Sequence, residues 1–380
     1  GDSIRINSRL MRVADRTFLW SETYTTRMGS IFDIQDSIAR AIGTTLTERL
    51  VRGPNAGRAP SAGELEAYNL YLRGRYAWHR RTQESLAEAV SYFEQAVATA
   101  PSYARAHAGL ADAYAVQGFY DYRPPGEAFP RAEAAARRAL ELDPAHAHAH
   151  ATLAYVSLYY HWNWPEAERA FERAIRLDPA YSTAHQWHAN FLTAMGRFDE
   201  AEAAMRRAME LDPLSLIANG ALGWVYYNAG DFTRAIEQCS RTLELDPEFK
   251  LAWFWSGLAH EGLGRHEEAV DLLEKALALS PESAITLAAL AHAHAAAGRT
   301  DRARELLRDL LAAEARYIPS FEVAKVHLAL GEEDIALTWL ETAYEQRSHS
   351  MAFLRVDPQL ATLQAHPRFR DLLRRVGHPI

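Results

Sequence analysis

Closely spaced histidines are the residues of this sequence that most readily suggest chemistry. The chain has 380 residues and 16 histidines, and three of these, His146, His148 and His150, alternate with alanine. His146 and His150 lie one helical turn apart, a spacing at which two imidazoles can share a metal ion. No cysteine or carboxylate stands at the matching spacing to complete a tetrahedral site. We therefore expect no metal ion and no cofactor.

Other kinds of chemistry have even less support. Cys239 is the single cysteine, and the sequence has no nucleophile elbow, phosphate-binding loop or dinucleotide fingerprint. A formal net charge of −8 and a pI near 6.1 argue against nucleic acid as the partner. No apolar run approaches the ~18 residues of a membrane span. This chain is thus predicted to be no enzyme, with no nucleic-acid partner and no direct membrane insertion.

Any functional residue must be positioned by a repeat of about 34 residues that runs through most of the chain. Its clearest marker is an alanine, found at Ala89, Ala132, Ala167, Ala201, Ala235, Ala269, Ala303 and Ala336. The successive intervals are 43, 35, 34, 34, 34, 34 and 33 residues, so the first contains an insertion. A proline recurs at Pro101, Pro144, Pro179, Pro213, Pro247 and Pro281, and a glycine at Gly196, Gly230, Gly264, Gly298 and Gly331.

Each marker has a physical reason. Two antiparallel helices cross closely only where a side chain is nearly absent, which explains the alanine in the second helix of each repeat. The first helix offers a small residue at the matching place, at Gly74, Ala111, Ala154, Ala189, Gly223, Gly257, Ala291 and Ala324. The recurring glycine supplies a left-handed residue after the first helix, and proline suits the first turn of a helix. Each repeat is therefore predicted to be a helical hairpin.

These residues resemble the tetratricopeptide repeat (TPR) family, whose 34-residue motif has large residues at positions 4, 7 and 11. The motif also has small residues at positions 8 and 20 and proline at 32, and the fifth repeat matches with Leu222, Gly223, Tyr226, Ala235 and Pro247. The resemblance implies an all-α fold, a right-handed α-solenoid of about eight hairpins over residues 64–347. Residues 348–380 are expected to form capping helices, because the last repeat would otherwise expose an apolar face.

The same register offers a second interpretation of the histidines and of the cysteine. His107, His150 and His185 all fall at position 4 of the first helix, where the family places a large packing residue. We interpret them as packing residues. Cys239 falls where another repeat has Phe171, which predicts a small buried hydrophobe rather than a reactive thiol.

In the TPR family the first helices line the concave surface, so positions 2, 5, 9 and 12 of each repeat would point into a groove. Exposed Trp, Tyr and Arg side chains are enriched in binding hot spots, and such a groove suits an extended peptide or a helix. We predict a protein or peptide partner there, although some of these side chains could instead pack between repeats. The candidate residues are Tyr68, Tyr71, Arg75, Trp78, Arg105, Asp112, His148, Tyr155, Gln186, Asn190, Trp224, Tyr227, Phe254, Leu258, Glu261 and His292.

The insertion in the second repeat, residues 117–129, is rich in aromatic residues. A loop that lengthens one repeat often lies at one edge of a solenoid and can fold over its groove. The aromatic side chains can equally fill a gap left by irregular packing. The sequence leaves both interpretations open.

Residues 1–50 have a different pattern. Residues 3–12 and 18–26 alternate like the strands of a hairpin, and apolar residues from Ile31 to Leu50 recur at helical spacing. We expect the end of a small α/β domain here, followed by a linker at 51–63. The sequences of residues 4–10, 18–24 and 31–38 resemble the end of the TolB-like module, which precedes TPR arrays in bacterial signalling proteins. An uncovered strand edge could pair with a second copy, so a homodimer through residues 1–50 is expected.

The resemblance implies a non-catalytic protein-interaction module, the scaffolding or sensory part of a larger bacterial signalling protein. One alternative is the regulatory C-terminal region of an enzyme, a class III nucleotide cyclase or a Ser/Thr kinase. Another is a solenoid that binds a small molecule or a metal. We expect a cytoplasmic location, or a periplasmic one if a membrane-spanning segment lies upstream.

Overall fold

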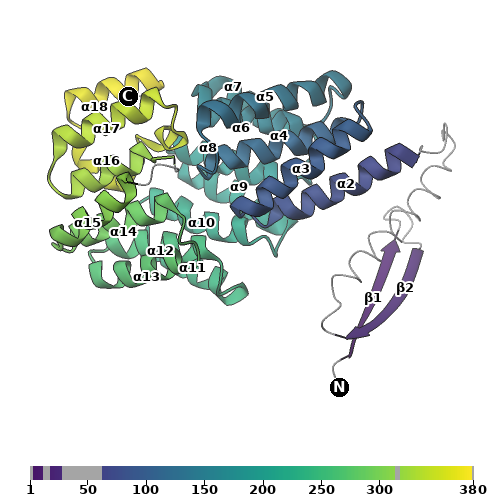
Figure 1. Cartoon of the computed structure of the whole chain (residues 1–380), viewed down its shortest axis with the longest axis horizontal. Coiled ribbons are helices and arrows are strands. Elements are labelled where there is room, and N and C mark those ends of the chain that lie inside the picture. The colour runs from purple at the N-terminus through teal and green to yellow at the C-terminus, as the bar shows by residue number, and fades with distance from the viewer. Residues whose placement is uncertain (1–2, 12–17, 28–61, 313–316, 379–380) are drawn as a thin grey trace. The chain divides into compact units, whose positions relative to one another are not determined.

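The computed structural model describes residues 3–11, 18–27, 62–312 and 317–378, and the chain forms two compact parts, Gly1–Glu66 and Ala67–Ile380 (Figure 1). In the first part, β1 (Ser3–Met11) and β2 (Phe18–Arg27) pair antiparallel, as the alternating pattern predicted. The helix expected between residues 31 and 50 lies outside the described residues. The same holds for the linker up to residue 61, after which a helix begins at Ala62.

Eight helical hairpins follow, one for each predicted repeat (Figure 1). Their helices are, in order, α2 (Ala62–His79) and α3 (Gln83–Thr99), α4 (Ala104–Phe119) and α5 (Pro125–Leu142), α6 (Ala147–Val156) with η2 (Ser157–His161) and α7 (Trp164–Leu177), α8 (Ser182–Ala194) and α9 (Phe198–Leu211), α10 (Leu216–Asn228) and α11 (Phe232–Leu245), α12 (Lys250–Gly262) and α13 (His266–Ala278), α14 (Ala284–Ala296) and α15 (Thr300–Leu311), and α16 (Ser320–Ala329) and α17 (Glu333–Glu345). Two short 3-10 helices, η3 (His349–Phe353) and η4 (Pro358–Leu363), and then α18 (Pro367–Val376) occupy the place predicted for a cap. None of the described helices is long and apolar enough to cross a membrane.

The recurring alanines lie where the two helices of each hairpin cross. All eight, from Ala89 to Ala336, are fully buried. A Cβ atom added to Gly223 would lie 2.7 Å from Cys239 Sγ and 3.2 Å from the backbone oxygen of Ala235. Cys239 is itself buried, which raises the pKa of its thiol to about 12 and agrees with a packing role. Close packing at the helix crossings therefore explains why small residues recur with the period of the repeat.

We expect Ala201→Leu and Ala235→Leu to lower the free energy of unfolding by about 1–3 kcal/mol each, because each crossing has no room for a larger side chain. The loss should appear as partial, stepwise melting, since repeats are coupled mainly to their neighbours. The control is Ala203→Leu, which makes the same change at an exposed position of α9, the helix that holds Ala201. If the two buried variants melt like the control, the assignment of the crossings is wrong.

The structure accommodates the two longer intervals, of 43 and 35 residues, in different ways. The 43-residue interval is accommodated by longer helices in the second hairpin, where α4 and α5 have 16 and 18 residues against 13 and 14 in α8 and α9. The turn between them is longer too, with residues 120–124 against 195–197. The 35-residue interval contains one extra residue, and the structure has a π-helical turn, η2, at the end of α6. A π-turn is a usual way for a helix to absorb a single insertion.

The array closes on itself through contacts between hairpins far apart in sequence. The indole nitrogen of Trp164 donates to the backbone oxygen of Gly377 at 2.8 Å, which joins the third hairpin to α18. Lys250 Nζ lies 3.3 Å from the hydroxyl of Tyr122, which joins the sixth hairpin to the turn of the second. The first helices of the hairpins therefore surround a shared interior.

Candidate ligand-binding site on the inner surface

The first helices of the hairpins form one common surface, which we call the inner surface. Side chains from α4, α6, α8, α10, α12, α14 and α16 line a cavity of about 150 Å³, and η3 completes its wall. A second hollow of about 590 Å³ adjoins it and shares four lining residues with it, Tyr120, Leu251, Phe254 and Ile285. Side chains of seven first helices and of η3 thus surround a hollow in the middle of the inner surface.

The predicted groove residues separate into three groups. Seven of them line the cavity: Tyr155, Gln186, Asn190, Trp224, Tyr227, Phe254 and Leu258. Two more, Glu261 and His292, contact residues that follow the last hairpin. The others lie on the first helices of the first three hairpins and do not line the cavity: Tyr68, Tyr71, Arg75, Trp78, Arg105, Asp112 and His148.

Several residues of the third group satisfy one another in a buried network. Asp112 is fully buried and lies 2.9 Å from Arg75 Nη1, while the Thr152 hydroxyl donates to its second oxygen. Tyr181 lies 3.5 Å from the same carboxylate and stacks on His148 with 3.7 Å between ring centroids. Burial raises the pKa of Asp112, and the Arg75 charge opposes that rise. This network holds the first four hairpins together and leaves its polar groups occupied by one another.

In the turns of the first three hairpins, a non-glycine residue has a left-handed backbone. In later hairpins glycine takes this conformation, with φ between 69° and 77° at Gly196, Gly230, Gly264, Gly298 and Gly331. Arg81, Asp121 and Trp162 take it instead in the first three hairpins, with φ of 58°, 55° and 53°. The conformation costs a non-glycine residue about 1–2 kcal/mol. Sequence reasoning missed these residues, although the missing glycine in the first three repeats was a usable signal.

Each of the three turn residues has a contact that offsets this cost. Arg81 lines the cavity, with its guanidinium 3.5 Å from the ring centroid of Trp78. Asp121 lies 3.4 Å from His349 Nδ1 in η3. Trp162 stacks on Tyr344 in α17, with 5.2 Å between ring centroids. The turns of the first three hairpins therefore help to close the array.

Residues 348–364, which we call the C-terminal segment, cross the inner surface. Phe353 packs edge-on against Trp224, with ring centroids 4.6 Å apart, and lies 5.9 Å from Tyr159. His349 lies 4.8 Å from the ring of Phe119. The cap predicted after residue 347 thus also covers predicted groove residues, which the sequence pattern did not reveal.

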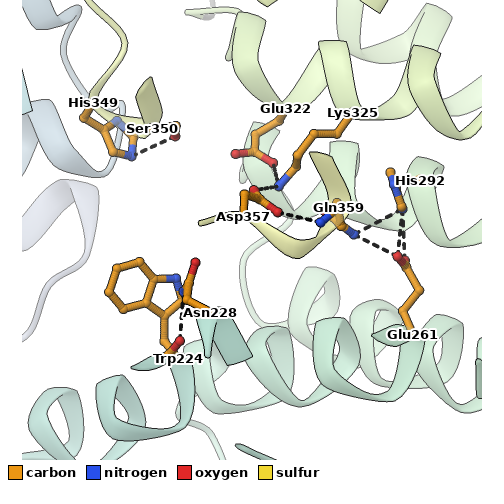
Figure 2. Close-up of polar contacts among 10 residues, drawn as sticks. All are labelled: Trp224, Asn228, Glu261, His292, Glu322, Lys325, His349, Ser350, Asp357 and Gln359. Carbon is orange, nitrogen blue, oxygen red and sulfur yellow. Dashed lines mark hydrogen bonds and ion pairs between the residues drawn. The ribbon is translucent and has the colours of Figure 1, made fainter. Parts of the chain in front are cut away.

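Ion pairs between buried side chains hold the middle of the C-terminal segment against α16 (Figure 2). Lys325 Nζ on α16 lies 2.7 Å from Glu322 and 3.2 Å from Asp357, and all three side chains are under 10% exposed (Figure 2). Burial by itself would lower the pKa of Lys325, but the two carboxylates outweigh it and raise the pKa. The ammonium group therefore stays charged and joins the segment to the last hairpin.

A second polar cluster holds the end of the C-terminal segment (Figure 2). The Gln359 side-chain amide donates to Glu261 Oε1 at 2.8 Å, and His292 Nδ1 lies 3.0 Å from the same carboxylate. Burial would raise the pKa of Glu261, but the neighbouring His292 and the hydrogen bonds from His292 and Gln359 lower it overall. The predicted groove residues Glu261 and His292 therefore recognise part of the chain itself.

Glu261→Gln should make the melting temperature less sensitive to acid. The lowered pKa of Glu261 means that its carboxylate stabilises the fold above about pH 4.3, the unfolded value, and loses this contribution as the pH falls through the folded pKa. We expect the wild type to melt higher than the variant at pH 7, with the difference shrinking toward pH 3. Scanning calorimetry at several pH values measures it, with exposed Glu268→Gln as the control. A difference that does not vary with pH would contradict the assignment.

The insertion in the second repeat serves both of the roles considered for it. Phe119 and Tyr120 line the cavity. Phe129 is fully buried and stacks on Tyr160 with 5.6 Å between ring centroids, so it fills the packing between the second and third hairpins.

The recurring histidines hold a specific hydrogen bond. His107, His150 and His185 each place Nε2 2.9–3.1 Å from the backbone oxygen of the proline six residues earlier. Trp253 makes the same contact in the sixth repeat. Because a carbonyl oxygen only accepts, Nε2 of His107 and of His185 must carry the proton, whereas Nε2 of His150 also lies 3.1 Å from Arg173 Nε, which can only donate. In these four repeats position 4 thus links the start of the first helix to the preceding turn. Among the described residues no three metal-ligating side chains converge.

Comparison with family models finds repeated matches along the array. One model described as "Tetratricopeptide repeat" matches residues 75–121, 156–215, 188–248 and 221–284. A second model with the same description matches residues 262–321. The matched segments follow the helical hairpins one after another.

Comparison with individual proteins finds matches of low identity or of short extent. A protein of Rhizobium meliloti (strain 1021) whose name places it among the adenylate cyclases ("adenylate cyclase 3") is 33% identical over 109 residues, which is 28% of this chain and 18% of that protein. This chain therefore spans under a fifth of that relative. The crystal structure of the APC/C hetero-tetramer Cut9-Hcn1 is similar over 90% of this chain and 59% of the other, with TM-score 0.53 and 17% identity, a likeness of fold. That of PilW, a type IV pilus biogenesis factor, covers 59% of this chain and 97% of its own, with TM-score 0.46 and 22% identity.

Proposed function

Because the chain belongs to the tetratricopeptide repeat family, whose arrays are protein-interaction scaffolds, we propose that it is a non-catalytic module whose inner surface binds a peptide or protein partner. In this proposal it is the scaffolding or sensory part of a larger bacterial signalling protein. The TolB-like identity of residues 1–50 and their pairing with a second copy belong to the same proposal.

One observation carries the proposal: the inner surface already holds a peptide, namely the C-terminal segment of the chain. Phe353 is the aromatic anchor against Trp224, and Gln359 supplies a side-chain hydrogen bond to Glu261. Aromatic anchors in well-packed pockets dominate binding energy in protein interfaces. A partner with an aromatic residue followed at similar spacing by a hydrogen-bonding side chain could replace the segment.

The test is competition between this segment and a free peptide. The full chain carrying both Phe353→Ala and Gln359→Ala has a weakened segment of its own. A fluorescent peptide with the sequence of residues 346–366 should bind this variant, measured by anisotropy. It should bind the wild type much more weakly, because a tethered segment competes at an effective concentration on the order of millimolar.

The matched control is the same peptide with alanine in place of its phenylalanine and of its second glutamine, the equivalents of Phe353 and Gln359. Circular dichroism checks that the variant chain is folded. If the folded variant does not bind the native peptide, or binds the control peptide equally well, the inner surface is not a peptide-binding surface of this kind.

A second candidate function is regulation of a nucleotide cyclase. The identity of 33% over 109 residues to the Rhizobium meliloti protein favours this class. In this case the intact gene product should convert ATP to cyclic AMP, and the double change Phe353→Ala and Gln359→Ala should alter its rate. An intact protein without cyclase activity, or a rate that the variant does not change, would remove this candidate.

A further inference from the structure

The cavity beneath the C-terminal segment has the size and lining of a small-molecule site. Its volume of about 150 Å³ exceeds the ~10–15 Å³ needed for one water molecule and matches cavities that accept a single aromatic ring. Aromatic side chains dominate its wall: Phe119, Tyr120, Tyr155, Trp187, Trp224, Tyr227, Phe254, Trp255, Phe321 and Phe353. Such rings favour a flat molecule, which can stack on one wall and meet another edge-on.

One wall of the cavity carries a buried cation without a counter-charge. Arg81 is 9% exposed and lines the cavity, and its Nε atom has no hydrogen-bond partner among the described residues. No described carboxylate lies within ion-pair distance of it either. Its guanidinium stacks on Trp78, which leaves the edge of the group to meet a ligand. Burial lowers the pKa of Arg81, the effect expected for a charge that lacks compensation.

The other buried cations of the inner surface differ from Arg81 in this respect. Arg75 is paired with Asp112, and Lys325 is paired with both Glu322 and Asp357. The cavity carboxylates Glu322 and Asp357 both contact the ammonium group of Lys325, whereas no described carboxylate contacts Arg81, whose charge would repel a cationic ligand bound beside it. A neutral ligand would leave the charge of Arg81 without a counter-charge. An anion is the ligand whose charge complements this wall.

We infer that the cavity binds a small planar monoanion, an aromatic carboxylate, with its carboxylate at Arg81 and its ring among Tyr155, Trp224 and Phe353. An arginine guanidinium matches the planar, two-oxygen geometry of a carboxylate. Because Phe353 belongs to the C-terminal segment, a bound ligand would also hold that segment against the inner surface. This site lies beneath the segment and goes beyond the proposed peptide function.

Three probes of similar shape and different charge test the inference on the full wild-type chain: benzoate, benzamide and benzamidine. Isothermal titration calorimetry should show benzoate binding at least about tenfold more tightly than benzamide, since a charge-assisted hydrogen bond is stronger than a neutral one. Benzamidine should bind most weakly. Benzoate should also slow amide exchange in residues 348–364. The inference is overturned if benzamide or benzamidine equals benzoate, or if no probe binds at about 10 mM.

Variants of the cavity wall then test whether benzoate binds in the cavity beside Arg81. Arg81→Gln should remove the tenfold preference for benzoate over benzamide, whereas Arg80→Gln, the same change at the exposed neighbouring residue, should keep it. Ala221→Leu narrows the cavity from α10 and should weaken benzoate and benzamide alike. If Arg81→Gln keeps the preference, or Ala221→Leu binds benzoate as the wild type does, benzoate binds elsewhere and the inference fails. The peptide experiment is independent, because it measures displacement of the segment without any of these probes.

Discussion

Replacing Lys325 with methionine is expected to lower the free energy of unfolding by about 3–5 kcal/mol. The ammonium group lies between Glu322 and Asp357, at 2.7 Å and 3.2 Å, and the lysine is 6% exposed. Without it, two buried carboxylates would face each other with no cation to balance them. Unfolding by urea, followed by circular dichroism, measures the loss.

Two comparisons separate this explanation from a general effect of the substitution. Lys275→Met changes the same residue type at an exposed position and should cost at most about 1 kcal/mol, the contribution of its ammonium group over the Trp253 ring. Adding Glu322→Gln and Asp357→Asn to Lys325→Met should recover most of the loss, because neutral amides need no cation. A Lys325→Met variant as stable as Lys275→Met, or no recovery in the triple variant, would show that the ion cluster does not hold the segment.

The Phe353→Ala change should release the C-terminal segment without unfolding the array. Phe353 is 7% exposed and packs against Trp224 and Tyr159. Truncating a buried phenylalanine costs about 3–5 kcal/mol, which corresponds to roughly a 10²- to 5 × 10³-fold change in an opening equilibrium. Hydrogen exchange detected by mass spectrometry should therefore accelerate by about that factor in residues 348–364 and little in α8 and α9.

Leu214→Ala is the control for this prediction, because Leu214 is 79% exposed and its removal should leave exchange unchanged. If Phe353→Ala instead accelerates exchange evenly through the helices, the segment opens only when the whole array unfolds. If exchange in the segment does not change, the contact between Phe353 and Trp224 contributes little to holding it.

The helical hairpins and seven residues of the candidate site could be predicted from sequence for the same reason. At each crossing the fit between residues such as Gly223 and Ala235 depends on a close contact within one hairpin, so it recurs with the period of the repeat. Helical periodicity then fixes which side chains of a first helix face inward. For this reason Trp224, Tyr227 and Phe254, chosen by register, all line the cavity.

The tertiary structure alone decided what the inner surface contacts. Closure of the array joins residues as distant as Trp164 and Gly377, which are 213 positions apart, and such contacts have no period to recognise. It depends on the small rotation between successive hairpins, which adds up over the whole array. Closure brings Phe353 onto Trp224 and places Arg81 in the cavity wall, while Arg75 and Asp112 are occupied by each other. The sequence by itself determined the hairpins and their inward faces, because these depend on neighbouring residues. The cavity and the C-terminal segment that lies over it depend on how all eight hairpins pack together.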